Sequence, residues 1–184
     1  MAFALLKLLL ALALPVVLFF GGGALMLHLS GRDQFPQTGA PESLPLNFRL
    51  GGYDLADAEA YWAWLGVEGQ GAELRFLEID LMFPLVYGGA LLVSQLLIWA
   101  WLGRPFSPVW LLAPLAVTVV CDWTENLVHW HQLRRAMQDA PAQAAWVQVA
   151  SLATTAKILC FTLSAVLLVA LALWRLGRIW RGMG

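Results

Sequence analysis

Several ionisable and amide side chains lie in or beside long apolar stretches of this sequence, in places from which a lipid bilayer would exclude them. They are Glu78, Asp80, Asp122, Glu125, Asn126, His129 and Lys157. Because such groups are costly to place in a membrane, their presence there is typical of a functional site. Several carboxylates near one lysine in a medium of low dielectric can accept and donate protons, so these residue types indicate general acid–base chemistry.

A metal site and a conduction route are two alternatives for the same residues. Glu125 and His129 are four residues apart and could share an ion with Asp80, whereas Asp122 and His129 lie about 10 Å apart along a helix axis, too far to ligate one ion. We assign no metal ligands, and no pattern identifies a cofactor. An ion or proton pathway would have to continue through a sparse series of hydroxyl groups, Ser94, Thr118 and Ser164.

A structural role is the third alternative. Lys157 would then neutralise one carboxylate, Asn126 and Tyr87 would satisfy the others, and the buried ions would fix the register of the helices without any turnover.

The polar residues recur at helical spacing in three apolar segments, which predicts one polar stripe on each of three helices. The stripes comprise Asp80, Tyr87 and Ser94; Thr118, Asp122, Glu125 and His129; and Thr154, Lys157 and Ser164. In lipid such faces turn inward to find partners. The first apolar segment has no comparable stripe and is expected only to close the bundle.

The composition predicts the architecture that holds these stripes together. Hydrophobic residues make up 60% of the 184 residues and charged residues 12%, and the mean hydropathy is +0.71, as in an integral membrane protein. Four apolar segments are each long enough to cross a bilayer, at about 20 residues a span: 4–28, 77–102, 109–131 and 144–176. We expect a single all-α domain, a four-helix transmembrane bundle, whose first segment is retained rather than cleaved as a signal peptide.

Charged and aromatic residues beside the spans predict the orientation in the cell membrane. The N-terminus, the second connection and the C-terminus carry basic residues, whereas the loop 29–76 is acidic, so both termini are expected in the cytoplasm and this loop outside. Arg134 and Arg135 in the third connection favour the opposite orientation, but the basic residues beside the other spans outweigh them. The tryptophans favour the same orientation as the basic flanks. Near the inner interface are Trp99, Trp101, Trp110, Trp174 and Trp180, and near the outer one are Trp130 and Trp146.

The outer loop contains a predicted short amphipathic helix. Asp54 can cap it, with Asp57 three residues later, and Leu55, Trp62 and Leu65 fall on one face before Gly66. We expect this face to lie against the headgroup region or the mouth of the bundle, either as a structural lid or as a gate over a ligand site.

The stripes should also meet at one depth. Side chains lean toward the N-terminus of their own helix, so Asp122 and Glu125 approach Lys157, and Asp80 lies at the same level. Pro84 cannot donate a hydrogen bond to the carbonyl of Asp80, which leaves a further acceptor there. Lys157 is therefore expected within salt-bridge or one-water distance of a carboxylate, beside a common cavity below the loop helix in the outer half of the bundle.

Together these patterns predict a membrane-embedded enzyme or binding protein for a lipid-like molecule. The expected acid–base or ion-pairing groups are Asp80, Asp122, Glu125 and Lys157, and the expected binding partners are Glu78, Tyr87, Trp123, Asn126 and His129. The alternatives are a noncatalytic accessory or assembly protein and a metal- or proton-coupled transporter. A second copy of the chain or a membrane complex is a further expected partner. No basic cluster with interleaved aromatic residues suggests nucleic-acid binding.

Overall fold

The computed structural model describes residues 2–35 and 38–182. Five helices account for most of this chain, and the described residues form no strand: α1 Ala2–Ser30, α2 Leu55–Asp80, α3 Phe83–Trp101, α4 Val109–Ala136 and α5 Ala144–Arg181. Three short 3-10 helices lie in the loop after α1: η1 Arg32–Gln34, η2 Pro41–Ser43 and η3 Leu46–Phe48.

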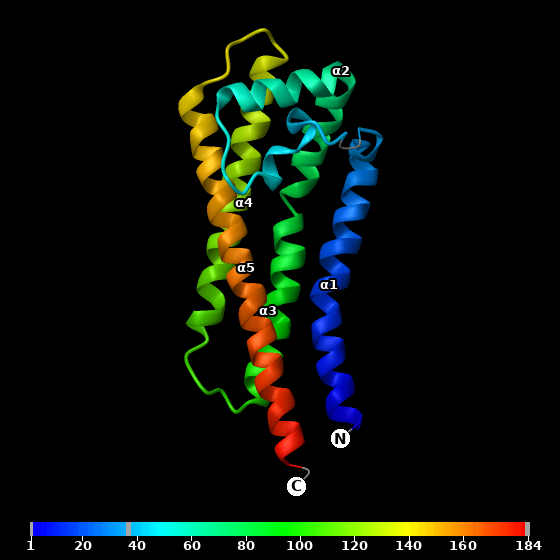
Figure 1. The fold of residues 1–184 in the computed structure, drawn as a ribbon, viewed down its shortest axis with the longest axis vertical. Coiled ribbons are helices and arrows are strands. Elements are labelled where there is room, and N and C mark those ends of the chain that lie inside the picture. The colour runs from blue at the N-terminus through cyan, green and yellow to red at the C-terminus, as the bar shows by residue number, and fades with distance from the viewer. Residues whose placement is uncertain (1, 36–37, 183–184) are drawn as a thin grey trace.

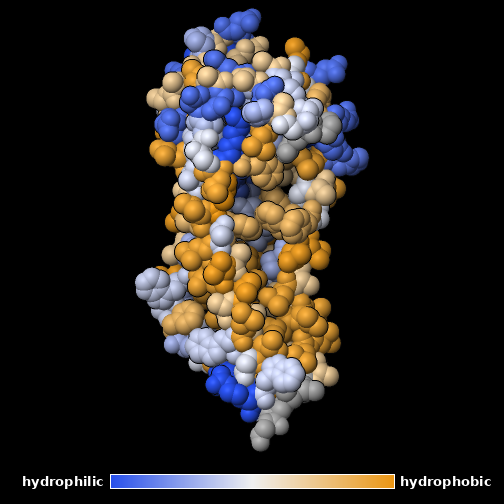
Figure 2. All heavy atoms as spheres, viewed as in Figure 1, coloured by the Kyte–Doolittle hydropathy of each residue, from blue (hydrophilic) through white to orange (hydrophobic). Residues whose placement is uncertain are grey.

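The bundle has four helical units long and apolar enough to cross a membrane, which confirms the predicted class. They are α1, the consecutive helices α2 and α3, α4, and α5. Figure 1 shows them running along the long axis, with the first half of α2 lying across one end and both chain termini at the other end. Figure 2 shows a broad hydrophobic belt around the middle of this view and hydrophilic residues toward its two ends. Such a belt is expected of a protein whose sides face lipid.

Helix α2 begins where the sequence predicts. The Asp54 carboxylate accepts a hydrogen bond from the backbone N–H of Asp57, and the Asp57 carboxylate accepts one from the N–H of Asp54, which makes a capping box. Trp62 and Leu65 are buried as expected, and Leu55 packs against the same apolar cluster. Gly66 interrupts the helix with φ 62° and ψ −179°, a conformation almost confined to glycine.

The chain beyond Gly66 differs from the prediction. Residues 67–76, expected to be loop, continue as the second half of α2 down to Asp80. The positive φ of Gly66 kinks the chain between two helical segments, so a second helical segment replaces the loop expected between Gly66 and the second span.

The predicted second span, 77–102, is also not one continuous helix. It breaks at Leu81 and Met82, between the end of α2 at Asp80 and the start of α3 at Phe83. Pro84 lies in the first turn of α3 and lacks the N–H that would continue the helical ladder. Side chains of α4 satisfy the freed carbonyls: Trp123 Nε1 donates to Leu81 O at 2.8 Å, and Asn126 Nδ2 to Asp80 O at 3.5 Å.

Apolar packing holds the half of the bundle that contains the termini. Leu8, Ile98, Leu111, Leu115 and Leu171 are among the buried residues of this cluster. Helix α1 approaches α3 closely at Gly22, where a Cβ atom would lie 2.7 Å from the ring of Phe83. The other half of the bundle is the polar one.

Candidate functional site

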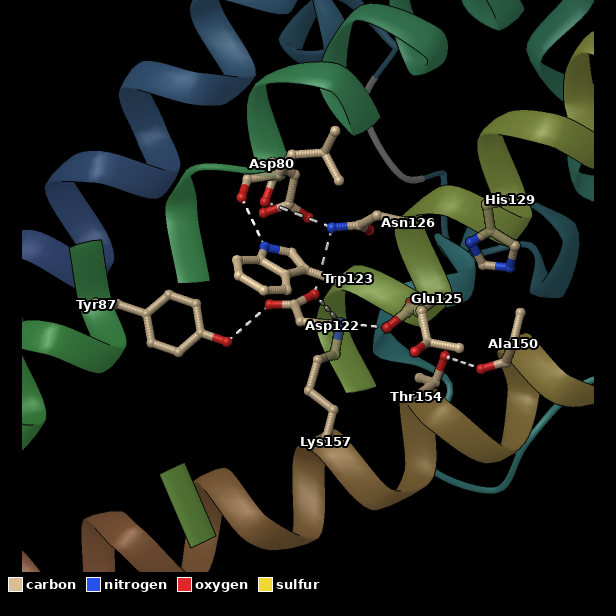
Figure 3. Close-up of polar contacts among 12 residues, drawn as sticks. Asp80, Tyr87, Asp122, Trp123, Glu125, Asn126, His129, Ala150, Thr154 and Lys157 are labelled. Atoms are coloured by element: carbon tan, nitrogen blue, oxygen red, sulfur yellow. Dashed lines mark hydrogen bonds and ion pairs between the residues drawn. The ribbon is translucent and has the colours of Figure 1, made fainter. Parts of the chain in front are cut away.

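Lys157 on α5 forms the centre of the polar cluster. Its Nζ lies 3.0 Å from Asp122 Oδ1 and also forms an ion pair with Glu125, both on α4. Figure 3 shows the three side chains converging between the two helices. The expected salt bridge is confirmed. The stripe positions explain it, because Asp122 and Glu125 are three residues apart and share one face of α4.

Tyr87 on α3 completes the coordination of Asp122. Its hydroxyl donates to Asp122 Oδ2 at 2.8 Å, and Asn126 Nδ2 lies 3.5 Å from Asp122 Oδ1. Both oxygens of Asp122 are therefore occupied. Tyr87, Asp122 and Asn126 are all at most 5% exposed, so Asp122 and these two partners are buried together.

Asp80, at the end of α2, differs from the other two carboxylates. The residue is 3% exposed and borders the cavity described next. Within residues 2–35 and 38–182 its carboxylate oxygens form no ion pair and no hydrogen bond shorter than 3.5 Å; Asn126, which binds the backbone carbonyl of Asp80, is a weak partner of the carboxylate. Asp80 thus presents to the cavity a carboxylate without an ion-pair partner.

A cavity of about 450 Å³ opens beside this cluster. Asp80, Tyr87, Asp122 and Lys157 form its polar wall, and the remaining lining is almost entirely apolar or aromatic. Figure 2 shows a hollow in the hydrophobic belt, with more hydrophilic atoms visible inside it. An apolar pocket with a few convergent polar groups is the usual form of a small-molecule site.

Helix α1 supplies one side of the cavity, which the sequence did not predict. Its lining residues run along a single stretch of the helix: Phe19, Phe20, Gly23, Ala24, Met26 and Leu27. The polar stripes could not reveal this, because α1 contributes an apolar wall. Nor does the predicted loop helix cover the cavity. Asn47 and Phe48 of the preceding loop lie there instead, together with Phe76.

Glu125 and His129 lie outside the cavity lining. Glu125 is 0% exposed and contacts Lys157 from the far side. His129 Nε2 is 2.6 Å from the hydroxyl of Tyr53, which is also hydrogen-bonded to Thr154 at 3.2 Å. Burial, together with the charge of Glu125, raises the pKa of Tyr53 above its usual value. His129 therefore anchors the loop before α2 rather than facing the cavity.

Two further expected binding residues also lie elsewhere. Glu78 is exposed, and its Oε1 accepts a hydrogen bond from Trp130 Nε1 at 3.0 Å. Trp123 is half-buried and bonds to the carbonyl of Leu81 at the helix break. The first contact joins α4 to α2, and the second joins α4 to the break between α2 and α3. The sequence placed these side chains near the cluster along the chain, but neither of them lines the cavity.

The metal alternative lacks a ligand set in the part of the chain that the structure describes. No three His, Cys, Asp or Glu side chains there come together in a group that could hold an ion. The three residues of that alternative, Asp80, Glu125 and His129, do not form such a group.

A second buried ionic network, which the sequence did not predict, holds the loop after α1. Arg32 Nε donates to Glu73 Oε2 at 2.6 Å, Arg32 Nη2 to Tyr61 Oη at 2.5 Å and Arg32 Nη1 to Phe35 O at 2.8 Å; Tyr61 Oη also donates to Glu73 Oε2 at 2.8 Å. Burial acts to lower the pKa of Arg32, but the charges of Glu73 and Tyr61 outweigh it, and the pKa is raised. The one available signal was an arginine directly after the first apolar segment.

This network borders a second, smaller cavity of about 150 Å³. Leu27, Asn47, Phe48 and Phe76 line both cavities. Arg32 and Glu73 therefore lie around the same small cavity as Asn47 and Phe48, which also line the larger one.

Fold and site together define an all-α bundle of membrane-spanning length with a buried acid–lysine cluster beside an apolar cavity. No family model, no curated protein and no solved structure matches the chain.

Proposed function

We propose that this chain is a membrane protein that binds an amphipathic, lipid-like molecule in the cavity between α1, α3 and α5 and acts on it by acid–base chemistry. The cavity supports this most directly. It combines apolar walls for a hydrocarbon body with a polar wall for a head group, and it opens in the hydrophobic belt (Figure 2). A ligand dissolved in the bilayer could enter there without crossing water.

The side chains of the polar wall have separate roles in this proposal. Asp80 and Asp122 border the cavity and are the groups that can exchange a proton with a bound ligand. Tyr87 orients Asp122, and Lys157 supplies its counter-charge. Glu125 holds Lys157 in place from outside the cavity.

A noncatalytic accessory protein is the second candidate, supported by the buried Glu125–Lys157 pair, which could serve only to fix the packing of α4 against α5. A transport route has less support. Thr118 Oγ1 donates to Pro114 O at 2.9 Å and Ser164 Oγ to Cys160 O at 3.0 Å, so these hydroxyls are occupied by their own helices.

Filling the cavity tests the proposal. Gly23 lines the cavity, and a Cβ atom there would approach only the ring of Phe83, at 3.8 Å. Gly23→Phe should place a ring in the cavity. Mass spectrometry of extracts of the purified protein identifies any lipid-like species that is enriched with the protein over its level in bulk membrane lipid. We expect the amount of that species to be at least about tenfold lower with Gly23→Phe than with the unmodified protein.

Gly21→Phe is the matched control, since Gly21 is on the same helix with nothing within 4 Å of a Cβ atom. It should retain the enriched species. Finding no enriched species in the unmodified protein, or equal retention by Gly23→Phe, would contradict the proposal.

We further propose that both termini are cytoplasmic, which would place the cavity in the outer half of the membrane. The termini lie at one end of the bundle (Figure 1), and the basic flanks favour the cytoplasm. In a background in which Cys121 and Cys160 are replaced by alanine, Glu42→Cys should react with a membrane-impermeant maleimide in intact cells. Glu42 is exposed, whereas its neighbour Ser43 is buried. Labelling only after lysis would reverse the orientation.

A further inference from the structure

We infer, resting on the proposed function, that the ligand is an amphiphile with a cationic amine head, which pairs with Asp80 and lies against the aromatic rings of the cavity. The charges of the cluster, its aromatic lining and the position of Lys157 each support this assignment.

The charges of the cluster leave Asp80 without an ion-pair partner. Three carboxylates, those of Asp80, Asp122 and Glu125, face one ammonium group, that of Lys157. Lys157 is engaged by Asp122 and Glu125, and the remaining oxygen of Asp122 accepts from Tyr87. A buried carboxylate without a counter-charge is costly. A cation in the cavity would satisfy it.

Aromatic rings beside this wall suit the same kind of head group. Phe19 and Phe161 stack with centroids 5.1 Å apart, and Tyr87 lies edge-on to them at 5.6 and 5.4 Å. Phe83 lies 5.1 Å from Tyr87. All four rings line the cavity. The face of an aromatic ring attracts a cation within about 6 Å, most strongly where water is excluded.

An anionic head group fits this wall poorly. Its one contact of opposite charge would be Lys157, whose ammonium is already held by two carboxylates. A phosphate or carboxylate in the same place would also meet Asp80 and Asp122, which border the cavity. Like charges at close range disfavour binding and thereby exclude the wrong partner.

Two long-chain probes that differ in charge at the head group test the inference. Sphinganine carries a free amine, and N-acetylsphinganine has the same chain but no charge. Binding of each, as the tritiated compound, is measured by scintillation proximity on the purified protein in dodecyl maltoside. We expect the unmodified protein to prefer sphinganine by at least about tenfold, and Asp80→Asn to reduce this preference to near unity.

Glu78→Gln is the matched control, because it removes the same charge from the same helix at an exposed position outside the cavity lining. It should keep the full preference. Phe161→Leu provides a second variant that leaves every charge in place. It should weaken sphinganine binding several-fold and leave N-acetylsphinganine binding unchanged.

The outcomes separate this inference from the proposed function. Equal binding of the two probes, both blocked by Gly23→Phe, would overturn the cationic head group and leave the lipid site standing. A preference that persists in Asp80→Asn would likewise overturn the assignment to Asp80. Binding of neither probe above the level of Gly23→Phe would overturn the inference and count against a lipid site altogether.

Discussion

Replacing Lys157 with methionine should destabilise the bundle by about 3–5 kcal/mol, the usual cost of removing one partner from a buried ion pair. Methionine has a similar length but no charge, so Asp122 and Glu125 would remain buried at 3% and 0% exposure without a counter-ion. Tryptophan fluorescence during titration of the detergent-solubilised protein with dodecyl sulfate measures the loss as a shift of the unfolding midpoint.

Two controls show whether charge is the cause. Lys7→Met removes the only other lysine of the chain, which is exposed near the N-terminus, and should leave the midpoint unchanged. Adding Asp122→Asn and Glu125→Gln to Lys157→Met removes the stranded charges and should restore most of the stability. An unchanged midpoint for Lys157→Met alone would contradict an ionic role in the fold and remove support for the structural alternative as well.

Replacing Arg32 with methionine should cost a similar amount, about 3–5 kcal/mol, but chiefly in the loop region. Arg32 is 5% exposed and donates to Glu73, Tyr61 and the carbonyl of Phe35. Without it, Glu73 is a buried acid with only the Tyr61 hydroxyl as a partner. Limited proteolysis should cut the loop between α1 and α2 faster, and the unfolding midpoint should fall.

Arg32→Lys should not rescue this loss, because a compact ammonium cannot reproduce the forked geometry by which the guanidinium reaches three acceptors. Arg75→Met is the matched control, as Arg75 is an exposed arginine with one hydrogen bond, to Ser30 O at 3.1 Å. Equal proteolysis of the Arg32 and Arg75 variants would show that the Arg32 network does not hold the loop.

The two networks have different consequences for the proposed site. Lys157 with Asp122 and Glu125 sets the charge of the cavity wall, whereas the Arg32 network lies beside Asn47 and Phe48 around the smaller cavity. Loss of the first should change which head group binds, and loss of the second should change how readily any ligand leaves.

Local pattern predicted most elements of this fold, but not the second half of α2 or the break at Leu81 and Met82. Apolar length predicted the four spans, the three-and-four spacing predicted the buried stripes, and the capping box at Asp54 predicted the start of α2. Pro84 signalled the free carbonyl of Asp80, which Asn126 then satisfies. These features depend on helical periodicity and on the backbone chemistry of single residues, both of which can be read from the chain.

Partners and the cavity were decided only by the tertiary structure. Periodicity places Asp80, Asp122 and Glu125 on inward faces at one level, but it does not say which of them meets Lys157 or which is left facing open space. That choice depends on how far the helices rotate and approach one another, over distances of a few ångströms. The apolar wall from α1 and the pairing of Arg32 with Glu73, 41 residues apart in the sequence, carry no periodic signal, because packing between distant segments produces them.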